Sequence, residues 1–161
     1  MTEKYKIASE NLAKAADIAI AVFQKFPPAG WNEHYVTKEK NQITHFIDLY
    51  KEWKEHFLNP DPKFATLQSL KYRVEDVFTY FQEGHGKCVE EFWKEIKAQN
   101  LPYKRENKML KILKRKKITN IHEYDFVIDV IVPYEQEGLI NHDEVVILNE
   151  LIAQFESRKK K

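Results

Sequence analysis

Apolar residues recur along most of the chain every three to four positions, with polar residues between them. This period is typical of amphipathic helices that bury one face. The helices are expected at residues 3–25, 37–57, 62–83, 87–100, 104–116, 118–134 and 142–156. Short connections with proline, glycine or asparagine separate them. The pattern predicts an all-α fold, a single-domain helical bundle of about six to seven helices over residues 1–157. A basic disordered tail, 158–161, is expected to follow.

The most apolar stretch, residues 118–140, is expected to be the centre of the bundle. Its β-branched residues also suit a strand, but Asp125 and Asp129 lie four apart and favour a helix. The residues expected on its buried side are Tyr124, Val127, Ile128, Val130, Ile131 and Tyr134. Ile128 is therefore predicted to be a core residue, and Ile128→Asp is predicted to unfold the protein.

Composition places the chain among folded proteins, because 43% of its residues are apolar and 13% are aromatic. The single cysteine, Cys88, excludes an internal disulfide and favours a reducing compartment. The first residues carry charges where a secretory signal has its apolar segment. No stretch of 18 residues is apolar enough to span a membrane. We therefore expect a cytoplasmic protein without a membrane segment.

The net charge of +1 hides an uneven distribution. Residues 104–117 contain eight basic side chains and one acid, whereas residues 118–157 contain nine acids and no lysine or arginine. The basic residues expected to contact phosphate groups are Lys104, Arg105, Lys108, Lys111 and Arg115. The alternative is that this basic helix neutralises the acidic segment that follows it. The charge pattern leaves both open, so nucleic acid is a possible partner through residues 104–117.

Arg115 and His122 are separated by six residues in a stretch expected to be helical. This Arg-x6-His spacing, with Tyr124 two residues further on, resembles the motif of the HEPN ribonuclease superfamily, whose members are small all-α proteins. The resemblance implies that Arg115 would bind phosphate and that His122 would be the acid–base residue. One branch of that superfamily places its arginine five residues before the histidine, where this chain has Lys117.

Two stretches have the residue types of metal sites. His122, Asp125 and Asp129 would line one helix face, but three ligands on one helix leave the fourth unspecified. Residues 133–144 resemble an EF-hand loop in outline, but Pro133 stands where that loop has its first oxygen ligand. No Glu-x-x-His pair of the di-iron bundles occurs. We therefore expect neither a metal nor another cofactor.

Exposed tyrosines on one side of the helix 62–83 indicate a contact surface. The residues predicted to bind a partner are Trp31, Tyr35, Tyr72, Asp76 and Tyr80. The sequence thus favours a non-enzymatic helical protein-interaction module, such as a bacterial regulator, an adaptor or an immunity-type protein. Its partner would be another protein or a second copy of the chain. The alternative is an RNA-directed protein, catalytic or not, that would use Arg115 and His122, with the basic helix 104–117 contacting phosphates.

Overall fold

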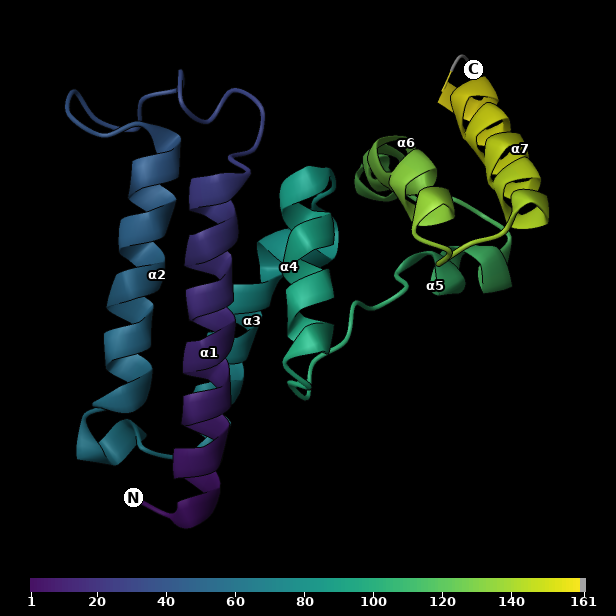
Figure 1. The fold of residues 1–161 in the computed structure, drawn as a ribbon. Coiled ribbons are helices and arrows are strands. Elements are labelled where there is room, and N and C mark those ends of the chain that lie inside the picture. Colours follow the sequence, from purple (N-terminus) through teal and green to yellow (C-terminus); the bar gives the residue numbers. More distant parts are fainter. Residues whose placement is uncertain (160–161) are drawn as a thin grey trace. The chain divides into compact units, whose positions relative to one another are not determined.

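A computed structural model describes residues 1–159 and confirms the all-α fold class (Figure 1). The described chain forms seven α-helices and one 3-10 turn, and it contains no strand. The helices are α1 (Glu3–Lys25), α2 (Gln42–Leu58), α3 (Leu67–Glu83), α4 (Lys87–Ala98), α5 (Met109–Arg115), α6 (Ile121–Gln136) and α7 (His142–Lys159), and the 3-10 turn is η1 (Pro62–Phe64). No helix in the described part of the chain is long and apolar enough to cross a membrane.

The chain divides into two compact units, where the sequence pattern predicts one domain over residues 1–157. Unit 1 comprises residues 1–82 and 86–105, and unit 2 comprises residues 83–85 and 106–161. Each unit has its own cluster of buried apolar residues.

Unit 1 is built around α1, which packs against α2 and α4 (Figure 1). Ala15, Ala16 and Ala19 are completely buried, and their small side chains let neighbouring helices approach closely. Around them lies an aromatic core in which the rings of Phe81 and Phe92 stack with centroids 3.7 Å apart. The buried Tyr50 hydroxyl has a partner within this core, because it donates to the Val77 carbonyl at 2.6 Å.

Two helices of unit 1 begin later than their sequence pattern predicts. Asn41, not Thr37, caps α2, because its side chain accepts a hydrogen bond from the Thr44 amide. The Thr37 hydroxyl instead closes a turn by accepting from the amides of Glu39 and Lys40. Pro62 starts η1 rather than α3, which begins at Leu67.

The expected basic helix from Lys104 to Lys116 is also shorter than predicted, because α5 begins only at Met109. The side chain of Asn107 accepts a hydrogen bond from the Met109 amide and donates one to the Leu139 carbonyl. Asn107 therefore anchors the preceding residues in a non-helical path, consistent with the nearby Pro102. Lys104 and Arg105 belong to unit 1 and do not extend the cationic face of α5.

Helix α6 confirms the helical prediction for the most apolar stretch but buries fewer residues than expected. Val127, Val130 and Tyr134 are completely buried beside α7. Ile128 is 46% exposed, so its placement in the core was wrong. Neighbouring residues of a helix lie about 100° apart around its axis. The small core of unit 2 covers only the side of α6 that carries Val127, so Ile128 lies outside this core.

Asparagine caps set the starts of the last two helices. The Asn141 side chain accepts from the Glu144 amide at 2.8 Å, and the Glu144 carboxylate accepts from the Asn141 amide at 3.0 Å. Asn120 likewise caps α6, with its side chain accepting from the Glu123 amide at 2.9 Å. Gly138 turns the chain between these helices at a φ of +78°, a conformation that favours glycine.

Helix α7 continues through Lys159, so Arg158 is helical rather than part of the disordered tail predicted from residue 158. The Arg158 guanidinium donates to the Ile118 carbonyl at 2.6 Å, which ties the end of α7 to the segment before α6. Residues 160 and 161 lie outside the described residues.

Candidate functional site

A groove of about 650 Å³ opens in unit 1 where α1 begins, α2 ends and α3 begins. We call it the Tyr72 groove. Its lining residues are Tyr5, His56, Phe57, Pro60, Asp61, Phe64, Ser69, Leu70, Tyr72 and Arg73. Its volume falls in the range of small-ligand and side-chain binding pockets, and its lining is mainly apolar.

The turn between α2 and α3 builds one wall of the groove. Helix α2 ends at Leu58, and the Asp61 carboxylate then accepts a hydrogen bond from the Lys63 amide. Pro62 occupies the first position of η1, where its missing amide hydrogen costs nothing. This turn leaves Phe64 55% exposed, covered in part by the Lys63 ammonium 5.2 Å from the ring centroid.

The floor of the groove belongs to the unit 1 core. Tyr5, Phe57 and Leu70 are all almost completely buried. The Tyr5 hydroxyl donates to the Phe57 carbonyl at 3.1 Å, which joins the start of α1 to the end of α2. Burial raises the pKa of Tyr5, and the nearby Arg73 charge only partly opposes it, so the hydroxyl stays neutral at physiological pH. The floor is therefore fixed by packing before any ligand binds.

The rim offers side chains that commonly dominate the binding energy of protein interfaces. Tyr72 is 64% exposed, and Phe64 lies on the same groove. Arg73 contacts Asp76 at 3.4 Å, and both side chains are more than 40% exposed. An exposed ion pair of this length contributes little, so Arg73 can exchange Asp76 for a carboxylate of a partner at small cost.

The structure does not bring the five predicted partner-binding residues together. Tyr72 and Asp76 lie on α3 near the groove. Tyr80 lies eight residues after Tyr72, about 12 Å along the helix. Trp31 and Tyr80 contact each other at 5.1 Å between ring centroids and pack on the core. Tyr80 therefore lies on a packed side of α3, not on the outward side as expected. Tyr35 is exposed in the loop between α1 and α2.

Tyr72 is the only one of the ten lining residues that the sequence pattern predicts to bind a partner. Phe64 falls within the helix predicted over residues 62–83. Phe64 was misplaced because the helix period was continued back to Pro62, whereas η1 interrupts it. The Asn-Pro-Asp-Pro segment, residues 59–62, is the signal that could have found this wall, since two prolines so close disfavour a continuous helix.

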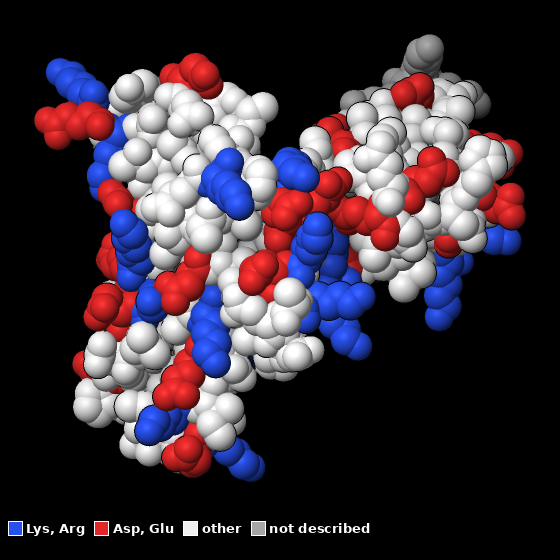
Figure 2. All heavy atoms as spheres, in the orientation of Figure 1, with Lys and Arg blue, Asp and Glu red and all other residues white. Residues whose placement is uncertain are grey.

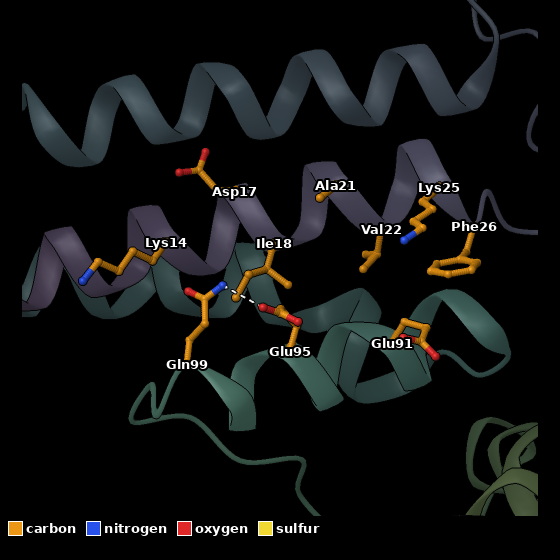
Figure 3. Close-up of a pocket in the computed structure, with 10 residues that line it drawn as sticks. All are labelled: Lys14, Asp17, Ile18, Ala21, Val22, Lys25, Phe26, Glu91, Glu95 and Gln99. Atoms are coloured by element: carbon orange, nitrogen blue, oxygen red, sulfur yellow. Dashed lines mark hydrogen bonds between the residues drawn. The ribbon is translucent and has the colours of Figure 1, made fainter.

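A second pocket, of about 410 Å³, lies between α1 and α4 (Figure 3). Two of its five charged lining residues form ion pairs, Asp17 with Lys54 at 2.8 Å and Glu91 with Lys87 at 3.0 Å. The hydrogen bond from Lys87 holds the pKa of Glu91 below its ordinary value, against a smaller opposing effect of burial. Ile18 fills part of the space between the two helices. Such contacts are expected where two helices with charged edges pack together. This pocket is therefore a weaker candidate for a binding site than the Tyr72 groove.

Arg115 and His122, which carry the HEPN resemblance, lie at the end of α5 and the start of α6. The Arg115 guanidinium binds both carboxylate oxygens of Glu123, and its Nε donates to the Lys117 carbonyl at 3.1 Å. Burial raises the pKa of Glu123, but hydrogen bonds from Arg115 and Thr119 outweigh it and lower the pKa overall. Arg115 thus has a structural partner, and His122 is exposed on α6.

Two of the remaining predicted phosphate contacts, Arg105 and Lys108, have partners within their own units. Arg105 donates to the Phe81 carbonyl at 3.0 Å, and Lys108 pairs with Glu83 at 3.2 Å. On the visible face of unit 1, basic and acidic side chains alternate over the surface (Figure 2). Among the described residues, no three histidine, cysteine or acidic side chains are grouped to hold a metal ion. His122, Asp125 and Asp129, the candidate ligands on α6, therefore do not form such a group.

Comparisons with protein-family models, with curated proteins and with solved structures find no match to this chain.

Proposed function

We propose that the protein is a non-enzymatic helical interaction module that binds a protein partner through the Tyr72 groove. The reducing compartment favoured by the free, buried Cys88 fits action in the cytoplasm. A regulator, an adaptor or an immunity-type protein would all act in this manner. The bound segment would place an apolar side chain against Phe64 and Tyr72 and a carboxylate against Arg73.

The observation that carries this proposal is the contrast between the floor and the rim of the groove. Tyr5 and Phe57 are at most 2% exposed, whereas Phe64 and Tyr72 on the rim are more than half exposed. Large aromatic side chains beside a fixed apolar floor provide contact area at a low cost in conformational entropy. This combination is characteristic of interface centres, where a few aromatic and arginine side chains supply most of the affinity.

The RNA-directed alternative has less support from the same residues. It relied on one continuous basic helix over 104–117, and α5 comprises only residues 109–115. It also relied on an available Arg115, whose guanidinium is held by Glu123. The groove therefore supports protein binding better than this set supports RNA cleavage.

The proposal is tested by affinity capture from cells of the source organism, with tagged wild-type protein and two single variants. Tyr72→Ala removes the rim aromatic, and Tyr35→Ala is the matched control because Tyr35 is also about 60% exposed but lies outside the groove. Both should keep the wild-type melting temperature within about 2 °C, since exposed substitutions rarely change stability by more than about 0.5 kcal/mol.

The expected result is one protein retained by the wild type and by Tyr35→Ala and lost with Tyr72→Ala. A central interface tyrosine is worth about 2 kcal/mol or more, which is roughly a thirtyfold loss of affinity. Equal capture by all three proteins would contradict the role of the groove. Sedimentation of the purified protein separates self-association from a foreign partner, because only a homomeric groove contact makes the oligomeric state sensitive to Tyr72→Ala.

A further inference from the structure

Unit 2 contains a cleft of about 540 Å³ between the end of α5, the segment before α6 and the last turns of α7. Three of its lining residues are cations, namely Lys116, Lys117 and Arg158, and none is an acid. The apolar part of the lining includes Ile118 and Leu151, both almost fully buried. This cationic cleft was not predicted, because the sequence pattern assigned Arg158 to a disordered tail.

Hydrogen bonds hold the backbone of the cleft in place. Lys116 ends α5 in the left-handed conformation, with a φ of +58°, and its amide donates to the Ile112 carbonyl. The carbonyls of the next two residues each accept a hydrogen bond. The Lys117 carbonyl accepts from Arg115 Nε at 3.1 Å, and the Ile118 carbonyl accepts from Arg158 Nη2 at 2.6 Å. Lys116 and Lys117 thus belong to a segment whose position is set without a ligand, and Arg158 of α7 is bonded to the same segment.

The cations of the cleft lack carboxylate partners. Within residues 1–159, no acidic side chain forms an ion pair with Lys116, Lys117 or Arg158. Arg158 is further fixed by its position over the Phe155 ring, 5.4 Å from the centroid. Its remaining donors on the planar guanidinium suit phosphate oxygens, which such a group binds in a bidentate manner.

Helix dipoles explain part of this cation cluster but not all of it. Helices α5 and α7 both end at the cleft, and each C-terminus carries roughly half a negative charge. Two such ends offset about one of the three positive charges, which leaves a surplus of about two. Like charges at this density repel one another, so an anion that neutralises them is stabilised.

We propose that this cleft binds the phosphate groups of a nucleotide or of single-stranded nucleic acid. The exposed Ala153 also lines the cleft, and its apolar side chain can contact a base or sugar beside the phosphates. The proposal is independent of the Tyr72 groove, because it uses different residues and a different ligand.

The test measures the anisotropy of a fluorescent 20-nucleotide single-stranded RNA titrated with the full-length protein at 50 to 200 mM salt. The variant is Lys116→Gln with Lys117→Gln. The matched control is Lys111→Gln with Lys114→Gln, which removes the same charge from exposed positions of α5 outside the cleft. Circular dichroism confirms that both variants keep the wild-type helix content.

The cleft variant should weaken binding at least tenfold at 50 mM salt, and the control should weaken it less than threefold. Losing two phosphate contacts should also reduce the slope of log affinity against log salt concentration by about 1.4. Competition by ATP or pyrophosphate at millimolar concentration would identify a small phosphorylated ligand, and its absence would identify the polymer. An equal loss in both variants, or no binding of RNA, ATP or pyrophosphate at 50 mM salt, would overturn the proposal.

Discussion

Adjacent positions on α6 should respond very differently to the same substitution. Val127 is completely buried in the core of unit 2, whereas Ile128 is 46% exposed. We expect Val127→Asp to unfold unit 2 and Ile128→Asp to leave it folded. Aspartate has a helix propensity close to that of both original residues, so the difference reports burial rather than intrinsic helix stability.

The expected losses of folding stability follow from the burial of the two side chains. Burying a valine side chain stabilises the fold by about 1.5–3 kcal/mol, and an unpaired buried carboxyl group adds a cost of several kcal/mol. Unit 2 has about 60 residues, for which a total stability of roughly 3–9 kcal/mol is typical. Val127→Asp therefore removes most or all of it. Ile128→Asp loses only the buried half of one side chain, about 1 kcal/mol.

The assay must follow unit 2 itself. All three tryptophans, Trp31, Trp53 and Trp93, lie in unit 1, so tryptophan fluorescence reports on that unit alone. Hydrogen exchange read by mass spectrometry resolves the peptides of α6 and α7. In Val127→Asp their amides should exchange at nearly unprotected rates, and in Ile128→Asp they should keep protection within about tenfold of the wild type.

Two results would refute the placement of these side chains. Equal loss of protection in both variants would mean that Ile128 is buried, as the sequence pattern predicts. Full protection in Val127→Asp would mean that the core of unit 2 does not include Val127.

Three further predictions concern a salt bridge, a thiol and a helix cap. Because the pKa of Glu123 is lowered in the folded protein, its bond to Arg115 stabilises the fold above the unfolded pKa of about 4.3 and is lost as pH falls through the lower folded value. The difference in urea midpoint between wild type and Glu123→Gln should therefore be present at pH 7 and shrink as the pH falls below the unfolded pKa and through the folded one. Burial raises the pKa of the Cys88 thiol to about 12, so its thiolate fraction at pH 8 is about a thousandfold below that of a free thiol, and a thiol reagent should react quickly only after unfolding in urea. Asn141→Ala should cost about 1 kcal/mol in chemical denaturation, and no loss would contradict the capping bonds to Glu144.

The helical period predicted most of the fold, because each helix has an apolar face long enough to define it. The ends of the helices were harder to predict. The start of α5 depends on Asn107 binding the distant Leu139 carbonyl, and such a contact leaves no local signal in the sequence. Ile128 was misplaced for a related reason, since the width of the buried arc depends on how many helices cover α6.

The candidate site was predicted in part. Tyr72 was recognised as an exposed tyrosine on α3 and lies on the groove. Trp31 and Tyr80 were grouped with it, but the loop after α1 carries Trp31 onto Tyr80 and Phe46, which packs both rings on the core. Whether a side chain on a second helix face is exposed depends on loop paths that periodicity does not encode.

The central claim, that the Tyr72 groove binds a protein partner, is tested most directly by photo-cross-linking in cells of the source organism. Benzoylphenylalanine replaces Phe64 on the groove or, as the control, Tyr35 in the loop outside it; both side chains are more than half exposed. Irradiation should give one discrete cross-linked product from position 64 and none of that mass from position 35. The product should disappear when Tyr72→Ala is added to the position 64 protein. The same product from both positions, or its persistence with Tyr72→Ala, would contradict a partner bound in this groove.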